Sequence, residues 1–134
     1  MTDLTNILSY AIPAGVLLFI LARKKMMTSN KNVKNVSGAE ASELVSKDKS
    51  FLILDVRTKG EFSGGHIPGA INIPVQELST RVEEIKKNIE QPVMVYCASG
   101  GRSPGAVSIL LKNDFTNIYH LSRGISSWSG KLKR

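Results

Sequence analysis

The sequence of residues 93–104 is VMVYCASGGRSP, and it combines the end of a strand, a short loop and the start of a helix. Residues 93–96 form a continuous apolar run, which is typical of a strand buried on both faces of a parallel sheet. Pro104 is allowed in the first turn of a helix, so a helix is expected over residues 103–112. Between them lies a small, glycine-containing loop. The segment therefore predicts one strand–loop–helix unit of an α/β fold.

The sequence on either side repeats this alternation. Short apolar runs predict further strands at residues 51–54, 70–73 and 117–121. Helices are expected at residues 37–46, from residue 58 onward, at residues 78–88 with one apolar face, and at residues 125–128. Two of these starts place a hydroxyl residue three positions before a glutamate, as in a capping box. Strands that alternate with helices predict a parallel sheet covered on both faces.

The charge of the chain is unevenly placed. Its 134 residues suffice for one domain, and the formal net charge is +7. Two basic clusters follow an apolar N-terminal run and occupy residues 131–134, and neither is interleaved with the aromatic residues that stack on bases. Nucleic acid is therefore not an expected partner, whereas the basic excess suits anionic substrates and an anionic membrane surface.

The N-terminal run predicts a membrane anchor. Residues 7–22, ILSYAIPAGVLLFILA, carry no charge, and Arg23, Lys24 and Lys25 follow them. A cleaved signal peptide would have its basic residues before the apolar run. The charge order predicts a single pass through the inner (cytoplasmic) membrane, with the folded part facing the cytoplasm. The expected organisation is an anchor at 1–25, a polar tether at 26–35, a domain at 36–130 and a frayed basic tail at 131–134.

Cys97 is the candidate reactive residue, and it is the single cysteine of the chain. A lone cysteine excludes an internal disulfide and a multi-cysteine metal site, and it fits a reducing compartment. The alternative is a buried structural thiol. Gly100 and Gly101 allow backbone N–H groups to point inward as an anion nest, and a helix N-terminus follows. Arg102 adds a positive charge that either clamps the loop or meets an anionic substrate. These features favour a Cys97 thiolate.

Other polar residues have structural interpretations. Asp55 and Arg57 are expected to form an ion pair or loop clamp at a strand end. His66 is expected to make a structural hydrogen bond, and Trp128 to cap the core. His120 has no acidic or cysteine partner nearby in sequence and is taken as structural or exposed.

From residue 36 to residue 128 the chain resembles a single rhodanese domain. The resemblance rests on four segments in order: LDVR at 54–57, the stretch 61–74 with GHIPGAINIP, the loop at 97–103, and RGI with the following tryptophan at 123–128. Four residues separate Cys97 from Arg102, as in the family's sulfurtransferases, whereas its phosphatase relatives have five. Two departures are Arg123 in place of a more usual glycine, and Pro104-Gly105 at the helix start.

The resemblance implies a five-stranded parallel sheet and sulfur transfer through a Cys97 persulfide. It implies a loop that binds the substrate, supported by Asp55 and Arg57, with no metal or cofactor. The expected substrate-binding residues are Ala98, Ser99, Gly100, Gly101, Arg102 and Ser103. The expected partners are a small anionic sulfur donor, such as thiosulfate or a persulfide, and a thiol, cyanide or protein acceptor. The alternative is a membrane-tethered sulfur carrier with little turnover of small molecules; an arsenate or phosphate enzyme is disfavoured by loop length.

Overall fold

The computed structural model of the chain describes Val16 and residues 30–134. Apart from Val16, the expected anchor at 1–25 therefore lies outside the described residues. Within the described part of the chain, no helix is long and apolar enough to cross a membrane. Residues from Asn32 to Arg134 form one compact unit.

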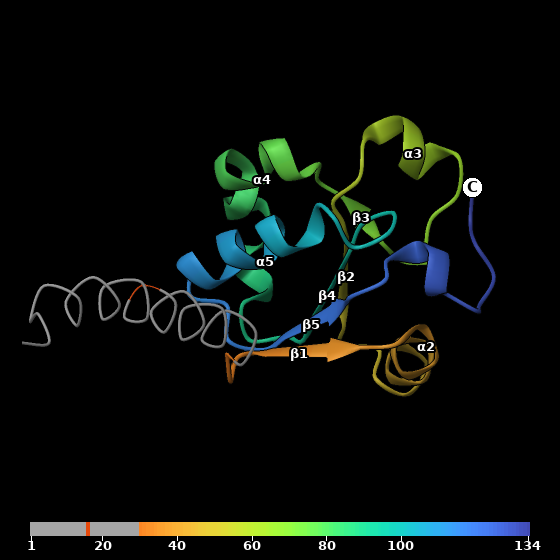
Figure 1. Cartoon of the computed structure of the whole chain (residues 1–134), viewed down its shortest axis with the longest axis horizontal. Coiled ribbons are helices and arrows are strands. Elements are labelled where there is room, and N and C mark those ends of the chain that lie inside the picture. The colour runs from red at the N-terminus through yellow and green to blue at the C-terminus, as the bar shows by residue number, and fades with distance from the viewer. Residues whose placement is uncertain (1–15, 17–29) are drawn as a thin grey trace, which may run out of the picture. The chain divides into compact units, whose positions relative to one another are not determined.

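The core of this unit is a five-stranded sheet in which every strand pair is parallel, as the family resemblance implied (Figure 1). The strand order is β1-β5-β4-β2-β3. The strands are β1 (Val33–Val36), β2 (Leu52–Asp55), β3 (Ile71–Asn72), β4 (Val93–Tyr96) and β5 (Ile118–Leu121). All four residues of the central strand β4 are fully buried, which explains why its sequence is continuously apolar.

Strand β1 corrects the boundary between tether and domain. The polar composition predicts a tether up to residue 35, but residues 33–35 belong to β1, which pairs with β5 over Val33–Val36. The sequence VKNV lacks a clear strand pattern because β1 lies at the sheet edge and only Val36 is buried. An edge strand needs less apolar surface than a central one, so its pattern is weak.

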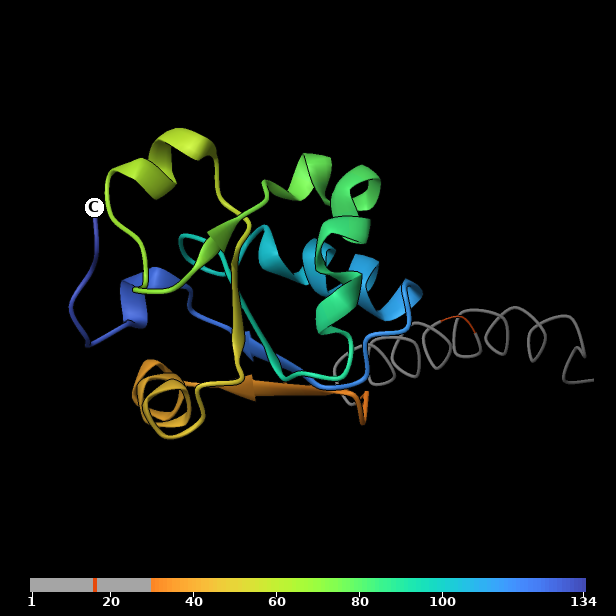
Figure 2. The same ribbon diagram turned by 180° about the vertical axis from the view of Figure 1, so that it is seen from behind.

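Helices cover both faces of the sheet (Figures 1 and 2). One face carries α2 (Gly38–Lys47) and η2 (Ile125–Ser127), and the other carries α4 (Val75–Arg81), η1 (Val82–Asn88) and α5 (Ser103–Lys112). The short helix α3 (Lys59–Ser63) follows the carboxyl end of β2. Because side chains alternate along a strand, Val95 and Cys97 point toward the α4–α5 face, while Met94 and Tyr96 point toward α2.

Local sequence signals explain where the helices begin. Ser37 and Glu40 form the expected capping box at α2, and Thr58 and Glu61 form the one at α3. The helix expected at residues 78–88 is instead an α-helix that begins at Val75 and continues from Val82 as a 3₁₀-helix.

This change of helix type keeps the predicted apolar face. Leu78, Val82 and Ile85 are all buried. Leu78 and Val82 are four residues apart in or next to the α-helix, whereas Val82 and Ile85 are three apart in the 3₁₀-helix, and each spacing matches its helix. The apolar pattern therefore located the buried face but not the helix type.

The segment after β5 closes over the loop that follows β4. Gly124 has a φ of +67°, and a Cβ at this position would lie 2.5 Å from the carbonyl oxygens of both Cys97 and Ala98. The Ile125 N–H donates to the Cys97 carbonyl at 2.9 Å. Arg123, the departure from the family pattern, is exposed and is not among the positive-φ residues of the described chain, so a side chain is tolerated there. Glycine is required at Gly124 and not at Arg123.

The C-terminal tail is not frayed over its whole length. The Lys133 N–H donates to the His66 carbonyl at 2.8 Å, and the His66 N–H donates to the Lys133 carbonyl at 2.9 Å. This antiparallel bridge ties the chain end to the turn after α3. We expected a frayed tail because residues 131–134 are basic. Composition carries no information about backbone pairing, so the bridge to His66 could not be expected from it.

We expect Gly124→Ala to lower the free energy of unfolding by about 2 kcal/mol, because the new Cβ must occupy a left-handed conformation and displace two carbonyl groups. Urea denaturation would measure the loss. The control is Gly60→Ala in α3, where a Cβ would meet nothing within 4 Å and should change stability by less than about 1 kcal/mol. Equal effects of the two substitutions would contradict this account of Gly124.

Candidate active site in the cysteine loop

The Cys97 thiol lies at the carboxyl end of the central strand β4, where ligands bind in open α/β sheets. Cys97 is only 1% exposed. The Gly100 N–H donates to its Sγ atom at 3.1 Å, and its Sγ also contacts the Ser103 Oγ at 3.4 Å. Helix α5 begins at Ser103, directly after the loop. The loop thus surrounds one buried sulfur atom with hydrogen-bonding groups.

These groups set the ionisation of the thiol. Burial raises the pKa of the Cys97 thiol, but the Ser103 side chain and the backbone N–H groups of Ser103, Arg102 and Gly100 together bring that pKa below its ordinary value. Hydrogen bonds to the charged form favour the thiolate. The net direction agrees with the anion nest expected from the sequence.

Of the two glycines in the loop, Gly100 is the one whose conformation and surroundings exclude a side chain. Its φ is +100°, and a Cβ would collide with the Ser122 carbonyl oxygen in the segment after β5. Gly101, by contrast, is exposed, and a Cβ added there would meet nothing within 4 Å. The inward turn of the Gly100 N–H therefore depends on its left-handed conformation and on close contact with the chain after β5.

Arg102 clamps the loop to helix α3. Its guanidinium makes two hydrogen bonds to the Glu61 carboxylate, from Nη1 to Oε1 at 2.7 Å and from Nη2 to Oε2 at 2.9 Å. This bidentate pair lowers the pKa of Glu61 to about 2. Of the two roles expected for Arg102, the structure displays the clamp. What Arg102 donates to Cys97 is its backbone N–H.

Asp55 and Arg57 form a second clamp at the end of β2. The Arg57 Nη2 donates to Asp55 Oδ2 at 2.7 Å and to the Gly65 carbonyl at 2.7 Å, and both charged side chains are buried. The Asn72 side chain donates to the carbonyls of Asp55 and Arg57. This network fixes the turn that leads into and out of α3, and hence the position of Glu61.

His120 is the residue whose surroundings differ most from expectation. It is buried, and its Nε2 lies 2.6 Å from the Ser103 Oγ, which in turn contacts Cys97. Its Nδ1 lies 3.0 Å from the Asn35 Oδ1 on β1. The lack of a partner nearby in sequence was misleading, because the partners come from β1 and α5. Burial lowers the pKa of His120, which favours the neutral imidazole.

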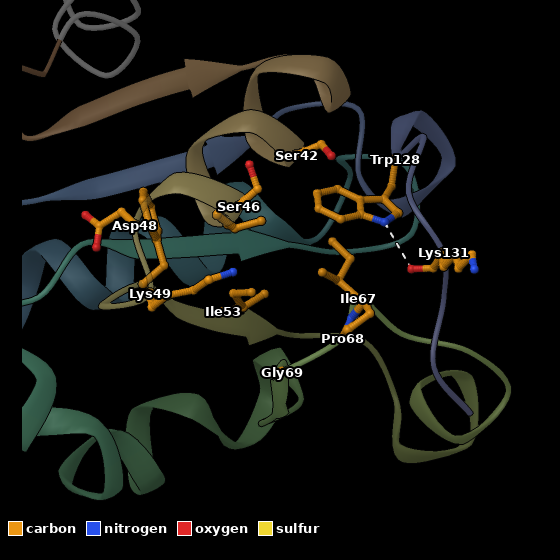
Figure 3. A pocket seen from close by; sticks show the side chains of 12 residues that line it. Ser42, Ser46, Asp48, Lys49, Ile53, Ile67, Pro68, Gly69, Trp128 and Lys131 are labelled. Atoms are coloured by element: carbon orange, nitrogen blue, oxygen red, sulfur yellow. Dashed lines mark hydrogen bonds between the residues drawn. The ribbon is translucent and has the colours of Figure 1, made fainter.

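The remaining candidates are structural. The His66 Nδ1 lies 2.9 Å from the Phe62 carbonyl, and its ring stacks on Phe62. Trp128 packs against the core cluster on the α2 face, as expected. It also borders an open groove on that face, lined by residues of α2 and of the Ile67–Gly69 turn (Figure 3). None of the lining residues belongs to the cysteine loop.

Among the described residues there is no cluster of three or more His, Cys, Asp or Glu side chains placed to bind a metal ion. The chemistry that the loop supports is nucleophilic. A thiolate held by N–H and O–H donors can attack an electrophilic atom of a bound anion.

Comparison with known proteins gives a consistent result. A family model described as "Rhodanese-like domain" matches residues 37–131. A rhodanese-related protein from Thermoplasma volcanium has a similar structure, with a TM-score of 0.65 and 28% identity over 75% of this chain and 97% of that chain. A rhodanese-like domain protein from Staphylococcus aureus matches with the same TM-score and identity.

Three similar proteins differ in how they are named. The uncharacterized protein YqhL of Bacillus subtilis is 46% identical over 60% of this chain, and the match spans 63% of YqhL, less than two thirds of its length. The putative sulfur carrier protein YrkF of the same species is 32% identical over 89% of this chain and 65% of its own. A sulfurtransferase of Allochromatium vinosum is 30% identical over 72% of this chain and 89% of its own.

We expect Glu61→Gln to lower the free energy of unfolding at pH 7 by about 1 kcal/mol, because the amide keeps the α3 cap but loses the charge paired with Arg102. Glu61 has a depressed pKa in the folded state, so its contribution is present above its unfolded pKa of about 4.3 and is lost as the pH falls toward about 2. Urea denaturation at several pH values would measure it.

The control for this substitution is Glu43→Gln, which breaks an exposed pair with Lys47 within α2. Little change is expected there. If the loss in free energy of unfolding caused by Glu61→Gln stays constant from pH 7 to about pH 2.5, the charge pair is not the cause of that loss.

Proposed function

The chain belongs to the rhodanese-like domain family, and on that premise we propose that it is a sulfurtransferase in which Cys97 carries the transferred sulfur as a persulfide. The observation that carries the proposal is the set of donors around the buried sulfur. The Gly100 N–H lies 3.1 Å from Sγ, and hydrogen bonds from the loop lower the pKa of the Cys97 thiol despite its burial. A merely structural thiol has no need of such donors.

The proposed reaction has two steps, and no net oxidation occurs. The Cys97 thiolate attacks the outer sulfur of a donor such as thiosulfate, the sulfur–sulfur bond of the donor breaks, and sulfite leaves with the bonding electron pair. Cys97 then holds a persulfide. A thiol, cyanide or protein acceptor attacks the terminal sulfur, takes it, and returns Cys97 to the thiolate.

The loop residues have separate proposed roles in this reaction. The backbone of Ala98, Ser99, Gly100 and Gly101 surrounds the terminal sulfur. The Ser103 Oγ accepts from the Cys97 S–H, and the Ser103 hydroxyl can donate to the sulfur once it is a thiolate. Arg102 holds the loop closed against α3 through Glu61. Four residues between Cys97 and Arg102 make a short loop, which suits one sulfur atom better than a phosphate group.

A sulfur carrier with little turnover on small molecules is the second candidate. The likeness to the putative sulfur carrier YrkF and the burial of Cys97 favour it. A carrier would hold a persulfide as readily as an enzyme, but it would release the sulfur only to a protein acceptor. The rate of transfer to cyanide separates the two.

We propose in addition that residues 1–25 anchor the protein in the inner membrane, with the folded domain in the cytoplasm. The support is the uncharged run at 7–22 and the three basic residues that follow it. An anchor would place the cysteine loop near membrane-bound sulfur donors or acceptors.

We expect the protein to transfer sulfur from thiosulfate to cyanide, and Cys97→Ser to reduce the rate to background, because a hydroxyl cannot form a persulfide. Mass spectrometry of the donor-treated protein should find one added sulfur atom on Cys97. A small phosphate ester should not be hydrolysed. Cys97-dependent hydrolysis of an aryl phosphate, or full transfer by Cys97→Ser, would refute the proposal. Persulfide formation without transfer to cyanide would favour the carrier.

We expect the full-length protein to sediment with membranes and to resist extraction by high salt, because an apolar span, unlike a basic patch, is held without charge. A chain starting at Met26 should remain in the supernatant. The measurement is immunoblotting of carbonate- and salt-washed membrane fractions. Full-length protein found wholly in the supernatant would exclude the anchor.

A further inference from the structure

A continuous line of polar contacts runs from the buried thiol to the sheet edge. Cys97 Sγ contacts Ser103 Oγ at 3.4 Å, Ser103 Oγ lies 2.6 Å from His120 Nε2, and His120 Nδ1 lies 3.0 Å from Asn35 Oδ1. The strand register explains the last contact, because Asn35 on β1 and His120 on β5 are direct cross-strand partners. We propose that His120 is a positioning residue that accepts the proton of Cys97 through Ser103 when the thiolate forms.

The partners of His120 fix the direction of each hydrogen bond. The Asn35 Oδ1 only accepts, so His120 Nδ1 must carry a proton. In the neutral imidazole, Nε2 is then an acceptor, and the Ser103 hydroxyl donates to it. A lone pair of the Ser103 Oγ then accepts a hydrogen bond from the Cys97 S–H. The structure has the contact in this direction.

Proton transfer along this line balances without any other group. The Cys97 proton moves to Ser103 Oγ as the Ser103 hydroxyl proton moves to His120 Nε2. The products are a thiolate, a neutral serine and an imidazolium. The Ser103 hydroxyl now donates to the thiolate, and the imidazolium donates to Ser103 Oγ and to Asn35 Oδ1. Each hydrogen bond of the line is retained.

Among the described residues, the hydrogen-bond partners of His120 are uncharged. The neighbouring elements present Asn35 from β1, Val95 from β4 and Ser103 from α5, and none of these carries a charge. Burial of the imidazole lowers the pKa of His120. Ser103 links His120 to the titratable thiol of Cys97. A neutral His120 is therefore available as an acceptor at neutral pH, and its imidazolium form is stabilised only when the thiolate is present.

The inference deepens the proposed function, since it matters for catalysis only if Cys97 is the reacting group. Its test, however, needs no sulfur donor. Iodoacetamide reacts with the thiolate, so the pH dependence of Cys97 alkylation in the full-length protein reports ionisation directly. If the protein transfers no sulfur but Cys97 alkylation still depends on His120, the proposed function is refuted and the relay is retained.

The first experiment compares the wild-type protein with His120→Gln, which keeps a hydrogen-bonding side chain that cannot be protonated. We expect its alkylation rate at pH 7 to fall about tenfold, the effect of a one-unit rise in thiol pKa, and the profile to shift to higher pH. The control is His66→Gln, which alters the second histidine of the chain away from the loop and should leave the profile unchanged.

The second experiment strengthens the partner of the imidazole. Asn35→Asp places a carboxylate against Nδ1, so the imidazolium is stabilised and alkylation at pH 6 should rise several-fold. In the His120→Gln background the same change should have no such effect, because no imidazole remains to be charged. An equal increase with and without His120 would mean that the effect of the substitution does not pass through the imidazole, and it would overturn the relay.

The third experiment requires no substitution and so does not depend on the folding of a variant. Ring ¹⁵N NMR follows the titration of His120 before and after carbamidomethylation of Cys97. Loss of the thiolate should move the His120 midpoint to lower pH, because coupled groups shift each other by the same amount. An unchanged His120 titration, or a His120→Gln alkylation profile that superimposes on the wild type, would overturn the inference.

Discussion

A buried sulfur atom can hold negative charge only if hydrogen-bond donors surround it, and this requirement shapes the carboxyl end of the sheet. The donors are backbone N–H groups of a short loop, which cannot turn inward without Gly100 in a left-handed conformation. The loop is then held from two sides. Arg102 ties it to α3 through Glu61, and Gly124 lets the chain after β5 close against the Cys97 carbonyl. Distant parts of the fold thus converge on a single atom.

Features confined to one stretch of chain were predictable from the sequence. The continuous apolar run at residues 93–96 identified the central strand, and the pairs Ser37–Glu40 and Thr58–Glu61 identified two helix starts. The cysteine loop was also predictable, because its donors and its helix follow one another along the chain. The helix type beyond Val82 was not, since an apolar spacing of three or four residues fits both an α-helix and a 3₁₀-helix.

Features made by pairing of distant segments were not predictable in this way. Strand β1 has one buried residue and a partner 85 positions further along, so its short, partly polar sequence did not distinguish it from a tether. Glu61 was recognised as a helix cap, but its pairing with Arg102 depends on the turn that Asp55 and Arg57 fix. His120 gained its partners only through the tertiary fold, Asn35 from the pairing of β1 with β5 and Ser103 from helix α5. The anchor proposed for residues 1–25 is argued from the hydropathy and charge order of the sequence, since of these residues the structure describes Val16 alone.

The position of β1 has a consequence for the dynamics of the site. An edge strand is bonded on one side only, so its local opening requires less free energy than opening of a central strand such as β4. Asn35, which orients the His120 ring, lies on this strand, whereas Cys97 and Ser103 are held by the centre of the fold. Local opening of β1 would break the hydrogen bond from the His120 Nδ1 to the Asn35 Oδ1. The imidazole ring could then change its tautomer. Through the proposed relay, the protonation equilibrium of the buried thiol would therefore respond to local opening of the sheet edge, on the timescale of local unfolding and not of side-chain motion.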